Sequence, residues 1–231
     1  MKDCLFVFDL DDTLYPERDF VRSGFSVVDE YLRSRLGCEG FLKIALARFE
    51  RGERGKIFDD SLKDLGVNPD QRIISELVAV YRAHRPEIVF FPGAPEFIAK
   101  LGGYGHLAVI TDGPLICQKN KASALNLSKW FEEIIFTDLL GKGHSKPDPL
   151  AFQMLSEKFS APPEKSVYLA DNPGKDFMAP NQLGWKTIQI VHPGQVRPLK
   201  DFKEPYSAKF RAEGFKEAYL ILKSLFPTVL K

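Results

Sequence analysis

The sequence predicts an α/β protein, in which a doubly wound parallel sheet is interrupted after its first strand by an all-helical insertion. Two observations support this fold class. Beyond residue 92, short apolar runs with strand character alternate with segments whose apolar residues recur at helical spacing. Between residues 20 and 85, only the helical spacing is found. Strands that alternate with helices form right-handed βαβ units and therefore a parallel sheet.

The first strand is predicted at residues 4–8, where five apolar residues follow one another before Asp9 interrupts them. A continuous apolar run of this length indicates a strand that is covered on both faces, as in a parallel sheet. Four or so helices are expected next, up to about residue 85, and glycines separate them.

The remaining elements follow in a regular order. They are a helix at 94–101, a strand at 107–110, a helix at 114–125, a strand at 134–136, a helix at 148–159, a strand at 167–170, a short helix at 175–183 and a strand at 187–191. Asp148 is expected to cap its helix, with Pro149 as the first helical residue. The spacing of Phe215, Tyr219, Leu222 and Phe226 predicts one more amphipathic helix.

The length of 231 residues suits one domain that carries an insertion. We expect an α/β core domain at residues 1–15 and 92–231, and a helical domain at residues 16–91. The insertion begins just beyond an Asp-rich loop at the end of the first strand. It should therefore sit above the carboxyl edge of the sheet, where open α/β sheets bind ligands.

Composition excludes several classes of protein. Lys and Arg number 32 against 31 Asp and Glu, so the net charge of +1 gives no reason to expect nucleic acid or a membrane surface as partner. Three cysteines without a CxxC pair predict neither a disulfide framework nor a zinc site. Without a signal peptide or a long apolar span, we expect a soluble, cytoplasmic protein. The oligomeric state is left open.

The predicted strand ends carry the chemistry. The residues there, and in the loops beside them, are Asp9, Asp11, Thr111, Asp112, Lys146, Asp171 and Asp176. Each motif alone has an ordinary explanation, since DxDxT runs are often turns with capping residues and a single lysine is usually solvated. In a parallel sheet, however, the carboxyl ends of the strands share one edge, and residues distant in sequence become neighbours there.

The charges of such a site call for a cation. Four carboxylates (Asp9, Asp11, Asp171 and Asp176) against Lys146 leave three negative charges, and like charges in a half-buried cleft are costly. Oxygen ligands select a hard ion, and Mg²⁺ is common where phosphate completes the coordination shell. The sequence therefore predicts a metal ion together with an anionic substrate.

Four ordered motifs resemble those of the haloacid dehalogenase (HAD) superfamily. They are FVFDLDDTL at residues 6–14, VITDG at 109–113, Lys146-Pro147, and YLADNPGKD at 168–176. The match extends over about residues 5–191, and its one small departure is Ala170-Asp171 where Gly-Asp is frequent. The insertion is similar to the C1 cap of subfamily I, which is rich in phosphatases. The resemblance implies a Rossmann-like core with an inserted helical cap.

The resemblance also implies roles for individual residues. Asp9 would be the nucleophile that forms an aspartyl-phosphate, and Asp11 the general acid for the leaving group and then the base for water. Mg²⁺ would be held by the Asp9 and Asp171 carboxylates and the Asp11 backbone carbonyl, with Asp176 in support. The groups implied to bind the phosphoryl oxygens are the side chains of Thr111 and Lys146 and the backbone N–H groups of Leu10, Asp112 and Gly113.

The insertion offers one candidate for substrate recognition. Residues 51–56 form a flexible basic loop in which Arg54 and Lys56 could reach an anionic substrate. A solvated turn is the alternative interpretation of this loop.

The leading functional hypothesis is a Mg²⁺-dependent phosphatase for a small phosphomonoester, such as a sugar phosphate or a nucleotide. A phosphomutase would use the same core. A 2-haloacid dehalogenase needs no metal, so Asp11 and the Asp171/Asp176 pair would be unexpected in it. A non-catalytic binding protein is disfavoured because no catalytic residue is missing.

Overall fold

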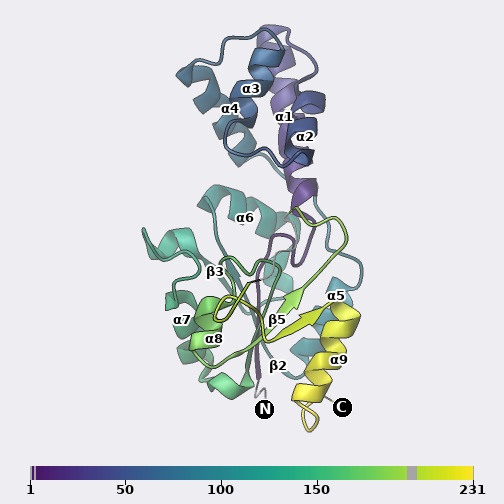
Figure 1. The fold of residues 1–231 in the computed structure, drawn as a ribbon, viewed down its shortest axis with the longest axis vertical. Helices are drawn as coiled ribbons and strands as arrows, with labels where there is room; N and C mark the ends of the chain where they lie inside the picture. Colours follow the sequence, from purple (N-terminus) through teal and green to yellow (C-terminus); the bar gives the residue numbers. More distant parts are fainter. Residues whose placement is uncertain (1, 3, 197–201, 231) are drawn as a thin grey trace.

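The structure, a computed structural model, describes residues 2, 4–196 and 202–230. It shows a parallel sheet flanked by helices, with four further helices packed together beyond one end of the sheet (Figure 1). In this part of the chain, no helix is both long enough and apolar enough to span a membrane.

All strand pairs are parallel, and the strand order is β3-β2-β1-β4-β5-β6. The strands are β1 (Cys4–Phe8), β2 (Gly105–Thr111), β3 (Glu133–Phe136), β4 (Ser166–Ala170), β5 (Lys186–Ile190) and β6 (Phe210–Ala212). The five predicted strands are confirmed. The sequence did not predict β6, because three residues are too few to show a pattern.

The apolar run of β1 is explained by its central position in the sheet. Cys4, Phe6 and Phe8 belong to one hydrophobic cluster, whereas Leu5 and Val7 belong to a second cluster on the opposite face. Successive side chains of a strand point to opposite faces, so a strand covered on both faces must be apolar throughout.

Helices cover both faces of this sheet. They are α5 (Ala94–Gly102), α6 (Leu115–Ala124), α7 (Leu150–Phe159), α8 (Met178–Gln182) and α9 (Phe215–Leu225). Residues of α5, α6 and α9 share the cluster of Phe6 and Phe8, and residues of α7 share the cluster of Leu5 and Val7. The doubly wound arrangement predicted from the sequence is therefore confirmed.

Two helix starts differ from the prediction. The helix expected at 175–183 is shortened to α8, because the backbone N–H groups of Lys175 and Asp176 turn back to the carbonyl of Asn172. The helix expected at 148–159 begins at Leu150, and Pro149 is its N-cap residue. The Asp148 side chain still accepts a hydrogen bond from Leu150 N at 3.0 Å, which serves the expected capping purpose.

The inserted helices are α1 (Glu17–Leu36), α2 (Phe41–Glu50), α3 (Ile57–Asp64) and α4 (Gln71–Ala83). They enclose a hydrophobic cluster of their own, built on residues such as Phe25, Phe41 and Leu77. The chain leaves and re-enters the sheet region at one place, where Phe91 N donates to Leu14 O at 2.9 Å. Both ends of the insertion therefore lie close to the end of β1, at the carboxyl edge of the sheet (Figure 1).

Candidate active site

The site begins where β1 ends. Asp9 directly follows Phe8, and its backbone N–H donates to Leu169 O at 2.9 Å, which ties it to the neighbouring strand β4. Asp171 directly follows the last residue of β4. The two aspartates are therefore neighbours because β1 and β4 are paired and parallel.

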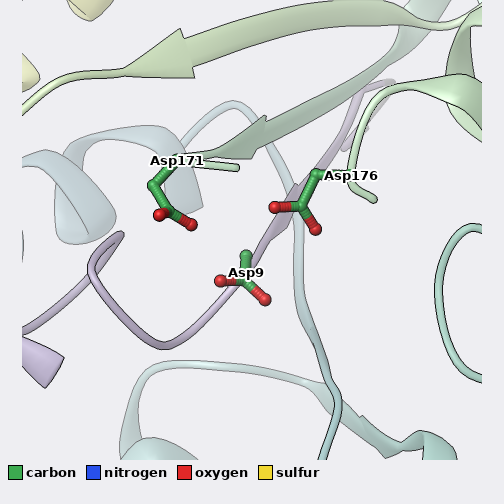
Figure 2. A group of neighbouring side chains, drawn as sticks. All are labelled: Asp9, Asp171 and Asp176. Atoms are coloured by element: carbon green, nitrogen blue, oxygen red, sulfur yellow. The ribbon is translucent and has the colours of Figure 1, made fainter. Parts of the chain in front are cut away.

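Three carboxylates converge at this edge. Asp9, Asp171 and Asp176 each offer one oxygen, and these oxygens lie within 4.8 Å of one another (Figure 2). All three residues are buried. Grouped carboxylates without a counter-ion are unfavourable in a buried place, so the arrangement requires positive charge nearby.

Lys146 supplies part of that charge. Its ammonium group is fully buried and contacts one carboxylate oxygen of Asp9, and it lies 2.8 Å from Asp176 Oδ1. The hydroxyl of Tyr168 is a third neighbour, at 2.9 Å. Burial would lower the pKa of Lys146, but Asp176 and Asp9 together raise it well above its usual value. Lys146 therefore remains charged.

The pKa values of two carboxyl groups in this cluster are raised. Burial raises the pKa of Asp9 to about 6, although the charges of Lys146 and Lys175 oppose this effect. Burial, together with the neighbouring Asp176 and Asp9, raises the pKa of Asp171 well above its usual value. Burial is the largest cause in both groups, so a cation bound beside these oxygens would favour their ionised forms.

The donor set fits a hard divalent cation. Asp9 Oδ2 is buried and has no hydrogen-bond partner in the described part of the chain. Asp176, by contrast, has both oxygens engaged, because Oδ1 faces Lys146 and Oδ2 accepts from Asn172 N at 3.1 Å. The oxygens left for a metal ion are therefore those of Asp9 and Asp171, and Asp176 lies behind them. Carboxylate oxygens of this kind suit Mg²⁺.

Asp11 lies in the loop after β1, and its carboxylate has a separate set of partners. Lys121 Nζ lies 2.7 Å from Asp11 Oδ1, and the Tyr15 hydroxyl donates to the same oxygen. Gln118 Nε2 lies 3.4 Å from Oδ2. Burial would raise the pKa of Asp11, but the charge and hydrogen bond of Lys121 lower it below its usual value.

Asp112 links three segments beneath the site. One carboxylate oxygen accepts hydrogen bonds from Thr137 Oγ1 at 2.9 Å and from Lys146 N at 3.1 Å. The other lies 3.1 Å from Lys175 Nζ. Its side chain therefore holds the loops of Lys146 and Lys175 against the end of β2. Burial would raise the pKa of Asp112, but the charges of Lys146 and Lys175, together with the hydrogen bonds, lower it below its usual value.

The other predicted phosphoryl contacts are also at this edge, in different settings. The Thr111 hydroxyl is buried and donates to Gln118 Oε1 at 3.0 Å. Gly113 has a φ of 124°, a conformation that favours glycine, and a Cβ there would lie 2.8 Å from Gln118 Nε2. Leu10 is fully buried, beside Asp9 and Asp11 in the loop.

A cavity of about 500 Å³ opens over these residues. On the sheet side, its lining includes Asp9, Asp11, Asp112, Gly113, Asp171 and Lys175. On the side of the inserted helices, it is lined by Glu17, Phe20, Tyr81 and Arg82. The insertion therefore contributes to the cavity through the first turns of α1 and the last turn of α4.

The cavity lining does not include Arg54 or Lys56. Arg54 donates to the carbonyls of Phe49 and Glu53, at 2.9 Å and 2.6 Å, and its guanidinium lies 4.1 Å from the centre of the Phe49 ring. Lys56 is exposed at the residue before α3. The basic loop is thus bound to its own helix, and the structure does not bring these two residues to the site.

The sequence did not identify the lysines Lys121 and Lys175. With them, the strand-end cluster comprises Asp9, Asp11, Asp112, Asp171, Asp176, Lys121, Lys146 and Lys175. Five carboxylates against three ammonium groups leave two negative charges, rather than the three inferred from the sequence. One divalent cation would neutralise them. Lys175 could have been noticed within YLADNPGKD, but nothing in the sequence distinguishes Lys121 from other helical lysines.

Comparison with known proteins places these residues in a family. A family model described as haloacid dehalogenase-like hydrolase matches residues 5–184. A glyceraldehyde 3-phosphate phosphatase from Methanocaldococcus jannaschii is 28% identical over 230 residues, which cover 95% of this chain and 96% of the relative. A protein of the same name from Methanopyrus kandleri is 24% identical over 198 residues, covering 80% and 82% of the two chains.

The fold is found in solved structures as well. The crystal structure of a HAD hydrolase from Bacillus subtilis, described as bound to magnesium, aligns with a TM-score of 0.67. The alignment covers 96% of this chain and 99% of the other, at 18% sequence identity. At this identity, the comparison shows a shared fold.

Proposed function

The chain belongs to the haloacid dehalogenase-like hydrolase family, and from this membership we propose that it is a Mg²⁺-dependent phosphatase acting on a small phosphomonoester. The observation that carries the proposal is the state of Asp9. One oxygen is held by Lys146, the other is buried without a hydrogen-bond partner among the described residues, and the residue lines the cavity. A carboxylate so placed is a nucleophile whose negative charge is partly compensated.

The reaction follows from the two aspartates of the β1 loop. An oxygen of Asp9 bonds to phosphorus while the bond from phosphorus to the leaving oxygen breaks, which gives an aspartyl-phosphate. Lys121 keeps the Asp11 carboxylate ionised, so Asp11 first takes up a proton from solvent and then donates it to the leaving oxygen. It then takes a proton from the water molecule that attacks the aspartyl-phosphate and releases inorganic phosphate. The transfer divides one difficult hydrolysis into two easier steps.

The charges of the transferred group need several partners. A Mg²⁺ ion held by Asp9, Asp171 and the Asp11 backbone carbonyl, with Asp176 behind them, would supply neutralising charge. Lys146 and Lys175 add two ammonium groups on the protein side. We assign a further phosphoryl contact to the hydroxyl of Thr111, which would give up its hydrogen bond to Gln118 in order to bind the phosphoryl group.

Backbone N–H groups complete the phosphoryl site in this proposal. Leu10, Asp112 and Gly113 lie in the loops after β1 and β2, at the edge where Asp9 stands. Donors fixed by the backbone stabilise charge that develops in the transition state, because they need no reorganisation during the reaction.

The leaving group would lie between the sheet edge and the insertion. We treat residues 1–15 and 92–231 as the catalytic core, and residues 16–91 as a cap that closes over it. The cavity of about 500 Å³ is within the usual size range of sites for small molecules. The relatives named glyceraldehyde 3-phosphate phosphatase support a three-carbon substrate such as glyceraldehyde 3-phosphate.

A dehalogenase is the weaker candidate. Its aspartate attacks carbon without a metal ion, whereas here Asp9, Asp171 and Asp176 bring oxygens within 4.8 Å of one another. A phosphomutase would return the phosphoryl group to a sugar instead of passing it to water. The similarity to proteins named phosphatases supports hydrolysis.

A phosphate-release assay tests the proposal directly. The purified protein should hydrolyse small phosphomonoesters, glyceraldehyde 3-phosphate among them, in Mg²⁺ and not after complete chelation. Asp9→Asn should abolish turnover, because its amide cannot form the acyl-phosphate. Full activity in chelator, or near-wild-type turnover by folded Asp9→Asn, would contradict the mechanism. Metal-independent release of chloride from a 2-chloroacid would instead support the dehalogenase.

A further inference from the structure

We propose that Lys121 is a positioning residue that fixes the carboxylate of Asp11 for proton transfer to the leaving group. This inference rests on the proposed function, because it assigns Lys121 a task only if Asp11 is the acid and base. Lys121 lies on α6, more than 100 residues from Asp11 in the sequence, and neither the motifs nor the composition pointed to it.

The contact between the two side chains is close and shielded from solvent. Lys121 Nζ lies 2.7 Å from Asp11 Oδ1, and the side chains are 5% and 20% exposed. Lys121 lines the same cavity as Asp9 and Asp11. This ion pair restrains the Asp11 side chain, because a charge-assisted hydrogen bond is shorter and stronger than a neutral one.

Lys121 and Gln118 act from the same face of α6. They are three residues apart, so both side chains point toward the β1 loop. Gln118 Nε2 lies 3.4 Å from Asp11 Oδ2 and donates to Asp112 O at 2.8 Å. Lys121 therefore makes the close contact to Asp11 from this helix, and Gln118 makes a longer one.

The other side of Lys121 touches the insertion. Its ammonium group lies 4.2 Å from the centre of the Phe20 ring, and Phe20 belongs to the first turn of α1. An aromatic face attracts a cation and excludes water from it. The ring of Phe20 packs in turn against Tyr81 and His84 at the end of α4.

The helix that carries Lys121 is also fastened to the end of the insertion. Asn120 Nδ2 donates to the carbonyls of Ala83 and His84, at 3.1 Å and 2.9 Å, and Cys117 Sγ lies 3.6 Å from Arg82 O. The position of Lys121 thus depends both on the core and on the packing of the insertion against α6. This arrangement connects the orientation of Asp11 to the packing of α1 and α4.

A purely structural ion pair predicts a different outcome from a positioning one. If Lys121 orients Asp11 for proton donation, its loss should harm only reactions whose leaving oxygen needs a proton. An alkyl phosphate, such as glycerol 3-phosphate, has a strongly basic leaving oxygen. In 4-nitrophenyl phosphate, the leaving phenolate is weakly basic and departs without protonation.

The experiment compares kcat/KM for these two esters in wild type, Lys121→Met, Asp11→Asn and the double variant, all saturated with Mg²⁺. This parameter reports phosphoryl transfer to Asp9 rather than the later hydrolysis. We expect Lys121→Met to lower it about 100-fold on the alkyl ester, within the usual range for proton transfer, and only slightly on the aryl ester. Lys119→Met changes an exposed lysine of the same helix and should leave both values unchanged.

Non-additivity gives a second, independent readout. Once Asp11 is replaced by Asn, removing Lys121 should cost little more, because the two residues act as one unit. Lys121→Arg keeps the charge and should restore part of the alkyl activity. Should Lys121→Met fail to fold, Lys121→Gln retains a donor and permits the same comparison.

Several results would overturn the inference. One is an equal loss on both esters, which indicates a structural role. Another is an additive loss in the double variant. If Asp11→Asn itself shows no dependence on the leaving group, Asp11 is not the acid and Lys121 has nothing to position. A wild-type protein that hydrolyses no phosphomonoester would refute the proposed function itself, which separates that failure from the others.

Discussion

Replacement of Asp9 by Asn should change how the stability of the metal-free protein depends on pH. In the folded protein, burial raises the pKa of Asp9 from 3.8 to about 6, whereas the unfolded chain keeps the usual value. The folded state thus binds the Asp9 proton more tightly. Stability from this group is present at low pH and is lost as pH rises through about 6.

The magnitude follows from the shift. Each pKa unit corresponds to about 1.4 kcal/mol, so raising the Asp9 pKa from 3.8 to about 6 makes ionisation cost the fold about 3 kcal/mol. Asp9 is only 2% exposed, so solvent does little to reduce this figure. Asn carries no charge at any pH and removes the cost. The attraction between ionised Asp9 and Lys146 is already contained in the pKa of about 6, so the figure of about 3 kcal/mol is net of that contact.

The assay is urea unfolding in chelator at about pH 4 and about pH 8. Relative to wild type, Asp9→Asn should gain about 2.5 kcal/mol between the two conditions, because the carboxyl of the unfolded chain is already partly ionised at about pH 4. Glu39→Gln, which changes an exposed carboxylate between α1 and α2, should gain nothing. Mg²⁺ should abolish the advantage of Asn, because the ion stabilises wild type by binding its folded state. A difference between wild type and Asp9→Asn that does not vary with pH would refute this reasoning.

Three further predictions concern single side chains. Arg82→Gln should alter the preference among phosphomonoesters, while Arg54→Ala and Lys56→Ala leave it unchanged, because of these three residues only Arg82 lines the cavity. A substrate panel measures this, and an altered preference in Arg54→Ala or Lys56→Ala would show that the basic loop does contribute to substrate recognition. Lys175→Met should raise the inhibition constant of inorganic phosphate by about tenfold or more, since a hydrogen bond to a charged group contributes about 1.5–3 kcal/mol; an unchanged constant would exclude contact with phosphate. Burial lowers the pKa of His192, so wild type should lose stability relative to His192→Gln as pH falls from about 7.5 to about 5.5. Thermal unfolding measures this, and a loss of relative stability as the pH rises would contradict the direction of the pKa shift.

The acidic half of the site could be predicted from the sequence because strand ends are visible there. An apolar run that stops at a polar residue identifies both a strand and its terminus, as at Phe8 and Asp9. Parallel pairing then brings Asp9 and Asp171 together without further information. The three-residue strand β6 shows where this reasoning fails, since pairing partners rather than its own pattern create it.

The basic half could not be predicted in the same way. Whether a helical lysine faces the site depends on the rotation of its helix, and the packing of Cys117 and Ala122 in the core sets that rotation for α6. Lys121 gives no sign of this in the sequence. The prediction that Arg54 reaches the substrate is not supported for a different reason. Its guanidinium donates to backbone carbonyls of its own segment, those of Phe49 and Glu53.

The charges of the strand-end cluster link the metal ion to the substrate. Two uncompensated negative charges would repel a phosphomonoester dianion from the cavity. Burial, which raises the pKa of Asp9 and of Asp171, adds to the cost of keeping their charges there without a cation. A divalent cation brings the cluster to neutrality, after which Lys146 and Lys175 can act on the phosphoryl oxygens. Two ligands that each improve the binding of the other must do so equally. Phosphate should therefore strengthen Mg²⁺ binding by the same factor by which Mg²⁺ strengthens phosphate binding, and calorimetric titrations in both orders should give one coupling free energy.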